Sequence, residues 1–255
     1  MRPLPPLRIF LGWTSNEMRA YNVAQASLKG TASCPVSIHR LSMSEMVARG
    51  YYKRPTEDRG AGYWDVISDA PMSTGHAIAR FLVPHLCEYD GWALFADGDV
   101  LFRVDINELF TLADETYAVQ VVQHEHNTTD LLKKDGQLQT SYLRKNWSSV
   151  MLFNCGHPAN GSLTVDLVNS VPGRDLHRFC WLDDSAIGAL PARWNHLVGW
   201  SAHDEDASIV HFTLGTPDLP GFEHQPFSDE WYEVAEMCGY RLVRPYRLIR
   251  PDRDP

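Results

Sequence analysis

The sequence predicts an α/β fold, a mostly parallel, Rossmann-like central sheet with helices on both faces. Near the start of the chain, apolar spacing predicts a strand over residues 7–12, a helix over 17–28 and a strand over 36–39. Further on, residues 92–96 form an uninterrupted apolar run, which is typical of a strand buried on both faces. Strand, helix, strand order and a doubly buried strand together indicate this fold class.

The remaining elements follow from the same patterns. Ser15 or Asn16 is a candidate cap for the first helix. The segment over 50–72 has no clear period, so it is expected to be a functional or mobile loop. The other predicted elements are a short helix at 44–48, a helix at 73–86, strands at 117–122 and 149–154, helices at 163–170 and 184–190, and a strand at 208–212.

Length and composition favour one domain. The 255 residues suit either one large α/β domain or two closely packed halves, and 44% of them are hydrophobic. The chain contains no internal repeat and no low-complexity linker. We therefore expect a single domain over 1–255, with a core over about 7–220 and a C-terminal helix and arginine-rich tail over 221–255.

Charge and cysteine content narrow the function class. The 23 Lys+Arg against 32 Asp+Glu give a net charge of −9, which disfavours a general nucleic-acid-binding surface. Residues 1–6 lack the apolar run expected of a secretory signal, and no stretch approaches the length of a membrane span. The 5 cysteines stand singly and without CxxC spacing, as expected of reduced thiols. These features predict a cytoplasmic protein.

The run Asp97-Gly98-Asp99 directly follows the buried strand over 92–96. Open α/β sheets bind ligands beyond the carboxyl ends of their strands. Two carboxylates this close repel each other unless a cation lies between or beside them, and hard oxygen ligands suit Mg²⁺ or Mn²⁺. Gly98 would let a phosphate or sugar approach the backbone. The alternative is a solvated turn, because such a motif is common.

The sequence around this motif is a more specific signal than the motif itself. Residues 81–86, 91–99 and 105–110, with the pair Arg80-Phe81, closely resemble the retaining glycosyltransferases of family 8, the glycogenin and lipopolysaccharide-galactosyltransferase group. The similarity is strongest to a bacterial, uncharacterised branch, also through residues 135–140 and 145–149. It covers roughly residues 9–217.

The resemblance implies a GT-A fold, a nucleoside diphosphate sugar donor, a carbohydrate or other hydroxyl acceptor, a Mn²⁺ or Mg²⁺ ion and retention of anomeric configuration. It also implies a late histidine as third metal ligand, and His211 in the run Val210-His211-Phe212 matches that element. Taken alone, a histidine at a strand end is more often a packed or solvated side chain.

The resemblance assigns roles to further residues. It implies donor binding by Gly12, Trp13, Thr14, Tyr21, Arg80, Gly98, Gln137 and Gln139, and catalytic roles for Asn154, Asp183 and Asp184. Trp13 would stack on a base or belong to the core. Arg80 would bridge the aspartates and the diphosphate, or satisfy a buried carboxylate. Asp183 and Asp184 would lie near the sugar, or compensate the dipole of a following helix.

Departures from the family pattern keep one other function open, and the paired aspartates keep a second one open. Thr14 stands where the family commonly has aspartate, and Gly215-Thr216-Pro217-Asp218 lacks the usual lysine and tryptophan. A nucleotide-sugar-binding protein that has lost transfer is one alternative, and a metal-dependent phosphohydrolase is another.

The C-terminal tail has an arginine at every third position. Those residues are Arg241, Arg244, Arg247, Arg250 and Arg253. They would meet an anionic acceptor or a lipid surface as a peripheral contact, or form a solvated terminal segment. The sequence carries no signal for an oligomeric state.

Overall fold

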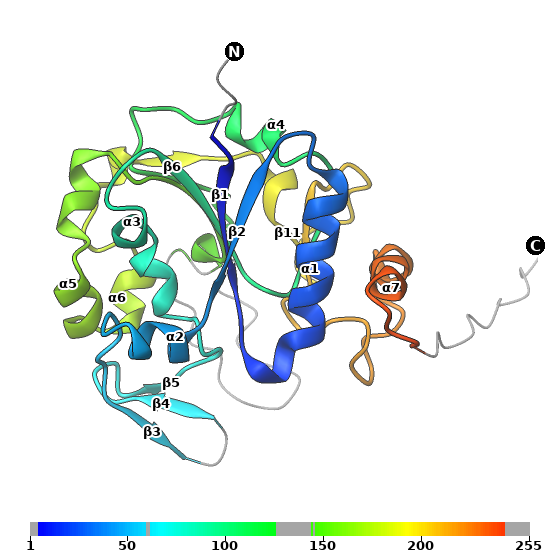
Figure 1. Cartoon of the computed structure of the whole chain (residues 1–255), viewed down its shortest axis with the longest axis horizontal. Helices are drawn as coiled ribbons and strands as arrows, with labels where there is room; N and C mark the ends of the chain where they lie inside the picture. The colour runs from blue at the N-terminus through cyan, green and yellow to red at the C-terminus, as the bar shows by residue number, and fades with distance from the viewer. Residues whose placement is uncertain (1–4, 60–61, 126–143, 145, 243–255) are drawn as a thin grey trace, which may run out of the picture.

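The computed structural model describes residues 5–59, 62–125, 144 and 146–242 (Figure 1). Its central feature is a six-stranded sheet in the order β10-β8-β9-β6-β1-β2. The strands are β1 (Leu7–Gly12), β2 (Val36–Leu41), β6 (Trp92–Ala96), β8 (Val119–Val121), β9 (Val150–Asn154) and β10 (Ile187–Ala189). β1 pairs in parallel with β2 and β6, and β8 with β10, whereas β9 runs antiparallel to both of its neighbours. The predicted α/β class with a mostly parallel sheet is confirmed.

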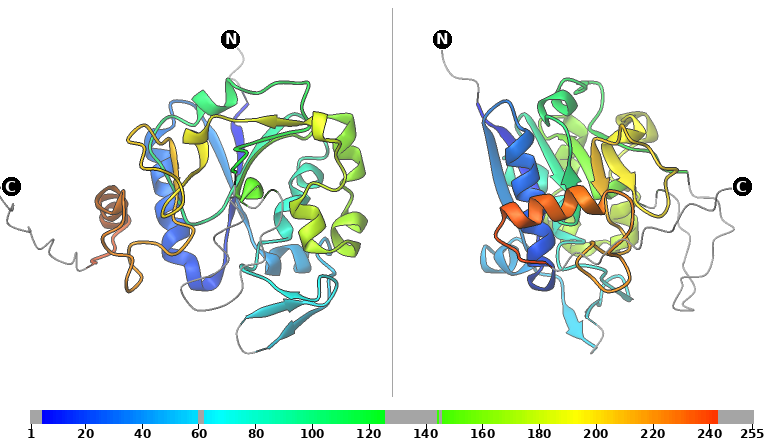
Figure 2. Two further views of the ribbon diagram at one scale, coloured as in Figure 1. Left: turned by 180° about the vertical axis from the view of Figure 1, so that it is seen from behind. Right: turned by 90° about the vertical axis from the view of Figure 1, so that its right-hand side faces the viewer.

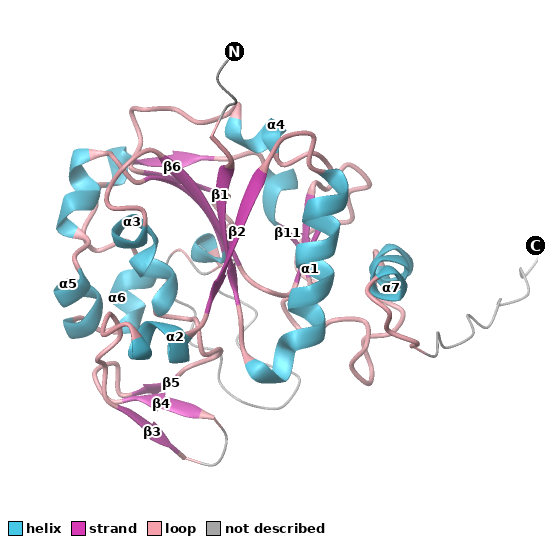
Figure 3. Ribbon diagram, viewed as in Figure 1, coloured by secondary structure: helices cyan, strands magenta, loops and turns pink. Residues whose placement is uncertain are grey.

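Helices cover both faces of this sheet, as Figures 1 and 3 show. Side chains of successive strand residues point to opposite faces, so each central strand contributes to two apolar clusters. Ile9 and Leu11 of β1 pack with Leu28 of α1 (Met18–Thr31) on one face. Phe10, between them, packs with the other cluster. The alternation explains why the central strands read as continuous apolar runs.

The opposite face is covered by several short helices. They are η2 (Ala79–Leu82), α3 (Val83–Leu86), α5 (Val165–Ser170) and α6 (Gly173–His177). Phe81 and Leu176 of this layer pack with Phe95 and Phe153 of the sheet in one buried cluster. Figure 2 shows the sheet between the two helical layers from further directions.

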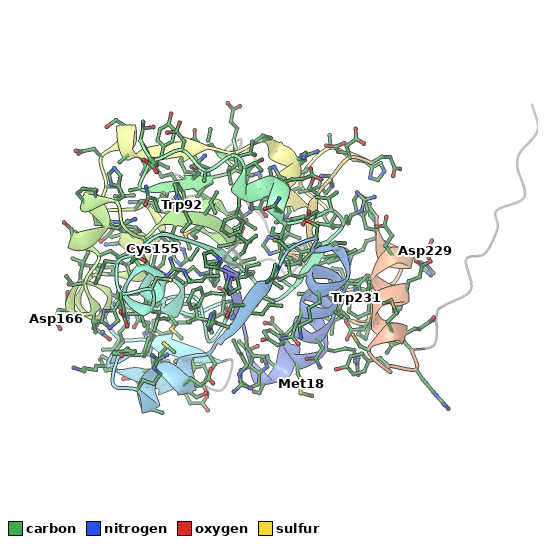
Figure 4. All side chains as sticks on the ribbon, turned by 45° about the horizontal axis from the view of Figure 1, so that its top comes forward. Met18, Trp92, Cys155, Asp166, Asp229 and Trp231 are labelled. Carbon is green, nitrogen blue, oxygen red and sulfur yellow. The ribbon has the colours of Figure 1, made fainter. Side chains whose placement is uncertain are left out.

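A second, three-stranded sheet adjoins the first, in the order β11-β12-β7. It contains β7 (Val100–Phe102), β11 (His196–Leu197) and β12 (Ile209–His211), with β12 parallel to β11 and antiparallel to β7. The C-terminal helix α7 (Ser228–Met237) packs on α1, and Trp231 of α7 points toward α1 (Figure 4). Trp231 and Val23 share one buried cluster.

The segment over 50–72 contains a third sheet, so the prediction of an irregular loop was wrong there. β3 (Thr56–Asp58), β4 (Tyr63–Asp65) and β5 (Ala70–Pro71) form an antiparallel sheet in this order. In Figure 1 it projects below α2 (Met43–Ala48). Three strands this short give too few residues for a period-2 pattern to be visible in the sequence.

A buried ion pair anchors this small sheet. Arg54 donates from Nε to Asp65 Oδ1 at 2.9 Å and from Nη2 to Oδ2 at 2.5 Å, and both side chains are at most 1% exposed. Nη1 of Arg54 donates to the carbonyls of Val168 and Val171 at 2.7 and 2.8 Å. The guanidinium group therefore joins β4 to the end of α5.

Three local predictions need correction. Neither Ser15 nor Asn16 caps α1, because both lie inside a 3-10 turn, η1 (Ser15–Glu17), that leads into it. Only η2 and α3 are helical within 73–86. Residues 184–190 form a 3-10 turn, η5 (Asp184–Ala186), followed by strand β10, because this segment pairs with the edge of the sheet at β8.

Other predicted elements are confirmed within one or two residues, among them β1, β2, β6, β9, α2, α5 and β12, whereas α1 ends three residues later than predicted. The remaining elements are α4 (Asn107–Phe110), η3 (Trp147–Ser149), η4 (Pro158–Ser162) and η6 (Ala192–Asn195). No helix in the described ranges has the length and apolar character needed to cross a bilayer. Of the tail arginines, Arg241 alone lies within the described residues. The division at about residue 220 stays a prediction.

Candidate metal-binding site

Asp97 and Asp99 flank the turn between β6 and β7, at the carboxyl end of a central strand. The glycine between them is required by packing. A β-carbon on Gly98 would lie 2.3 Å from the carbonyl oxygen of Gly12, the last residue of β1. Gly98 was expected to leave space for a ligand. In the structure, the space where its side chain would lie is occupied by the backbone of β1.

His211, the last residue of β12, lies next to the two aspartates. Its Nε2 is 3.1 Å from Asp99 Oδ1 and 3.9 Å from Asp97 Oδ2, and its side chain is 5% exposed. One ligand atom from each of the three residues lies within 4.8 Å of the others. The turn after β6 and the end of β12 thus bring together the three residues expected to hold a metal.

Asn195 supports the histidine from behind. This fully buried amide lies with its Oδ1 3.3 Å from Nδ1 of His211, and its Nδ2 donates to Ser149 Oγ at 2.9 Å. Because Nδ1 faces the amide, Nε2 is the ring nitrogen that faces the aspartates. Asn195 was not predicted, since nothing in its local sequence indicates the contact.

Two cationic or hydrogen-bonding side chains hold Asp97. Arg80 Nη2 lies 2.8 Å from Asp97 Oδ1, and Nη1 lies 3.3 Å from Oδ2. Nη1 also donates to the carbonyl of Ser148 at 2.8 Å, and Arg80 is 4% exposed. His76 Nε2 contacts Asp97 Oδ1 at 3.0 Å. Of the two predicted roles for Arg80, satisfying a buried carboxylate is the one this geometry favours.

The charges of these groups are coupled. Burial alone would raise the pKa of Asp97, but Arg80, His76 and His211 outweigh it and hold that pKa well below the usual range. Burial alone would lower the pKa of His211, but the carboxylates of Asp99 and Asp97 raise it above the ordinary value of 6.5. The two aspartates therefore favour a proton on the imidazole of His211.

Glu17 is a further carboxylate close to this charge cluster. Burial and the neighbouring Asp99 raise its pKa, although Thr14 Oγ1 donates a hydrogen bond to its carboxylate at 3.0 Å. Thr14 therefore has a definite partner at the end of β1. Glu17 was not singled out in the sequence, where it was only the first residue of the predicted helix over 17–28.

Trp13 and Tyr21 also lie near the end of β1. The ring of half-buried Trp13 is covered by the guanidinium of Arg40, whose Cζ is 4.8 Å from the ring centroid. Tyr21 is 7% exposed and packs in the cluster beneath α1. Burial raises the pKa of the Tyr21 hydroxyl. Their donor-binding roles stay predictions.

Asn154 lies apart from the two aspartates. β9 runs antiparallel to β6, so Asn154 lies opposite Trp92, while Val150 lies opposite Ala96 beside the aspartates. Four residue steps along a strand place it roughly 14 Å from the level of Ala96. Asn154 therefore lies at the opposite end of β6 from the aspartates, and its catalytic role stays a prediction.

Asp183 and Asp184 also lie apart from the cluster. They precede β10, the edge strand, which is three strands from β6 in the sheet order, or roughly 14 Å at the usual strand spacing. The side chain of Asp184 is 89% exposed and forms an ion pair with Arg144. Gln137 and Gln139 lie outside the described residues.

Comparison with known proteins identifies one relative by sequence and several similar folds by structure. No family model matches the sequence. "Protein CDI" of Arabidopsis thaliana is 40% identical over 236 residues, which cover 91% of this chain and 86% of the plant protein. The chain belongs to the CDI family. Membership of family 8 and of a bacterial branch stays a prediction, and the CDI relative is a plant protein.

Solved structures show which fold this CDI-family chain has. The bifunctional glycosyltransferase WbbM aligns with a TM-score of 0.58 at 14% identity, over 92% of this chain and 50% of WbbM. GlyE of Streptococcus pneumoniae TIGR4 aligns with a TM-score of 0.56 at 12% identity, over 90% of this chain and 60% of GlyE. The galactosyltransferase LgtC, in complex with donor and acceptor sugar analogues, aligns with a TM-score of 0.54 at 13% identity, over 94% of this chain and 98% of LgtC.

The CDI-family chain therefore has the GT-A fold of these glycosyltransferases. It spans half the length of WbbM and 60% of GlyE. At these sequence identities the alignments establish the fold and do not identify a substrate. Within that architecture, two carboxylates and one imidazole offer the oxygen and nitrogen ligands that suit a divalent cation.

Proposed function

We propose that this protein is a metal-dependent glycosyltransferase that moves a hexose-type sugar from a nucleoside diphosphate sugar to a hydroxyl of a carbohydrate or other acceptor. The observation that carries the proposal is the cluster of Asp97, Asp99 and His211, placed in a GT-A fold at the carboxyl end of β6. Ligands of open α/β sheets bind at this edge. The similarity to WbbM, GlyE and LgtC supports the reaction class through the fold alone.

The three residues fit a Mn²⁺ or Mg²⁺ ion. Their ligand atoms already converge within 4.8 Å, and Nε2 of His211 is directed at the carboxylates by Asn195. When bound, the ion supplies positive charge that offsets the charge developing on a departing diphosphate. Asp97, Asp99 and His211 would hold it, and Arg80 would keep Asp97 ionised and oriented.

We further propose that transfer proceeds with retention of anomeric configuration, on the basis of the family-8 resemblance. Among the described residues, none of the predicted catalytic groups Asn154, Asp183 and Asp184 lies beside the cluster. A reaction on one face of the sugar, in which the leaving phosphate accepts the acceptor proton, requires no protein nucleophile. Following the anomeric signal of the product by NMR distinguishes retention from inversion.

A panel of nucleotide sugars, assayed for hydrolysis and transfer with and without Mn²⁺, tests the main proposal. Turnover should require the metal and should be lost in Asp97→Ala, with the fold checked by circular dichroism. A thermal-shift screen of the same panel identifies the donor, because a ligand that binds the native state raises the melting temperature. Metal-independent turnover, or full activity of Asp97→Ala, would contradict the proposal.

A binding protein that has lost transfer is the second candidate. It is favoured by the departures from the family pattern, Thr14 in place of aspartate and the run Gly215-Thr216-Pro217-Asp218 without lysine and tryptophan. In this case a nucleotide sugar binds with Mn²⁺ in calorimetry, but the same panel shows neither hydrolysis nor transfer. Release of inorganic phosphate from simple esters would instead indicate a phosphohydrolase.

The cytoplasmic location is part of the proposal as well. All five cysteines lie in the described ranges and are free. Cys87 and Cys155 are buried in the core. Free thiols are usual in a reducing compartment.

A further inference from the structure

We propose that His76 is a positioning residue of the cation site, which turns the Asp97 carboxylate so that Oδ2 is left to bind the ion. The inference rests on the proposed function, because it assigns a role toward the metal held by Asp97, Asp99 and His211. His76 lies just before η2, outside the residues expected to act in the site.

The position of the His76 ring is fixed by the backbone of β1. The ring is 1% exposed, and its Cδ2 and Nε2 lie 2.4 Å from where a β-carbon of Gly12 would be. The ring therefore fills the space beside Gly12 that a side chain would take at any other residue. An imidazole held in this way has little freedom to turn, so its hydrogen bond has a definite direction.

That hydrogen bond selects one oxygen of Asp97. His76 Nε2 is 3.0 Å from Oδ1, and since an ionised carboxylate only accepts, Nε2 carries the proton and donates. Oδ1 also accepts from Arg80 Nη2 at 2.8 Å. Two strong donors thus occupy Oδ1.

The other oxygen faces the remaining ligands. Oδ2 has a longer contact of 3.3 Å to Arg80 Nη1 and lies 3.9 Å from His211 Nε2. A guanidinium fork on its own tends to bind both oxygens of a carboxylate equally. His76 makes the contact unequal, which leaves Oδ2 available on the side of His211. Without His76, Arg80 would compete with the ion for Oδ2.

The buried Nδ1 of His76 has no hydrogen-bond partner among the described residues. The ring therefore contacts the polar groups of the site through Nε2 alone, in its hydrogen bond to Asp97.

Binding of Mn²⁺ alone, measured by calorimetry and by the EPR signal of free Mn²⁺, tests the role without any donor sugar. His76→Phe keeps a ring of similar size and removes the donor, and it should weaken Mn²⁺ binding by about 10–100-fold, as for other partners outside a ligand set. His76→Gln places an amide N–H near the position of Nε2 and should restore most of the affinity.

The matched control is Val168→Ala, which removes two methyl groups from the core beneath α5. It should lower stability and leave Mn²⁺ binding unchanged. Wild-type affinity in folded His76→Phe would overturn the proposal. So would a folded His76→Gln that is as weak as His76→Phe.

A measurement on the wild-type chain covers the case in which both variants fail to fold. The ¹⁵N shift of His76 Nε2 should stay that of a protonated ring nitrogen when Mg²⁺ is added. Loss of that proton, with His76 becoming a ligand, would overturn the proposal. If instead wild-type Mn²⁺ binding is absent, or is unchanged by Asp99→Asn, the proposed function fails rather than the role of His76.

Discussion

His211 and Asp99 are joined twice, through their side chains and through the backbone. Nε2 of His211 lies 3.1 Å from Oδ1 of Asp99, and the N–H of Phe212, the next residue, donates to the carbonyl of Asp99 at 3.0 Å. The distance between the two proposed ligands therefore depends on strand pairing between β12 and β7 as well as on side-chain rotamers. A site arranged before the metal arrives loses little conformational entropy on binding.

Removal of one carboxylate charge should abolish tight metal binding. Asp99→Asn keeps the shape of the side chain but replaces an anionic ligand with a neutral one. We expect Mn²⁺ affinity to fall by more than about 100-fold, beyond the effect usual for a partner outside the ligand set. Calorimetry measures the loss, and Asp166→Asn, on the exposed side of α5, is the control. Equal losses of Mn²⁺ affinity in Asp99→Asn and Asp166→Asn would mean that the ion does not bind at Asp99.

Metal affinity should increase with pH. A proton on His211 Nε2 occupies the lone pair that a metal needs, and Asp99 and Asp97 raise the pKa of this group above 6.5. Below the raised pKa, affinity should climb by about tenfold per pH unit as one proton is displaced, and above it the curve should level off. Calorimetry between pH 5.5 and 8.5 covers this range. A plateau already complete below pH 6.5 would contradict the raised pKa.

Asn195 should affect the metal through His211. Asn195→Ala removes the side-chain contact to Nδ1 of His211, so the ring is free to turn away from Asp99. We expect Mn²⁺ affinity to fall by about 10-fold, which is the lower end of the range for loss of a residue that hydrogen-bonds to a metal ligand. Because Ser149 also loses a bond, urea unfolding should be measured in parallel. Unchanged affinity in a destabilised variant would mean that Asn195 acts only in folding.

A methyl group at position 98 should disturb both stability and the site. Gly98→Ala places a carbon 2.3 Å from the Gly12 carbonyl, so the backbone of β1 or of the turn must move. Overpacking of this kind costs about 1–3 kcal/mol in the free energy of unfolding. Gly30→Ala in α1 is the control, because its added methyl meets nothing within 4 Å and should be neutral or stabilising. Urea denaturation compares the two.

The buried pair Arg54–Asp65 should dominate the stability of the small sheet. Arg54→Leu leaves the Asp65 carboxylate buried without its partner, and we expect a loss of about 3–5 kcal/mol. Glu57→Ala removes an exposed pair with Arg59 in the same sheet and should cost about 0–1 kcal/mol. Similar losses for the two variants in urea denaturation would show that burial of the pair has no special effect.

Elements covered on both sides could be predicted from sequence. β6 and β9 have continuous apolar runs, and β1 has one over 9–11, because neighbouring residues such as Ile9 and Phe10 pack in opposite clusters. The strand β10 was mistaken for part of a helix, since its three residues have no readable period and form a strand only by pairing with β8. Such pairing is a property of the folded chain.

The same distinction applies to the site. Asp97, Asp99 and His211 stood at strand ends in recognisable motifs, and the fold brings them together. The distance of Asn154 from the aspartates could not be foreseen, because strand direction cannot be read from a strand's own residues. His76 has no motif at all, since its contacts to Gly12 and Asp97 arise only when two distant segments pack.

β12 lies in the middle of its sheet, with β11 on one side and β7 on the other. A strand held along both edges does not fray independently, so the backbone of His211 can move away from the aspartates only if that sheet opens. An ion at this junction would then tie the C-terminal third of the molecule to its first half. Chelators should accordingly loosen hydrogen-exchange protection in β7, β11 and β12 together, far beyond the three side chains that touch the ion.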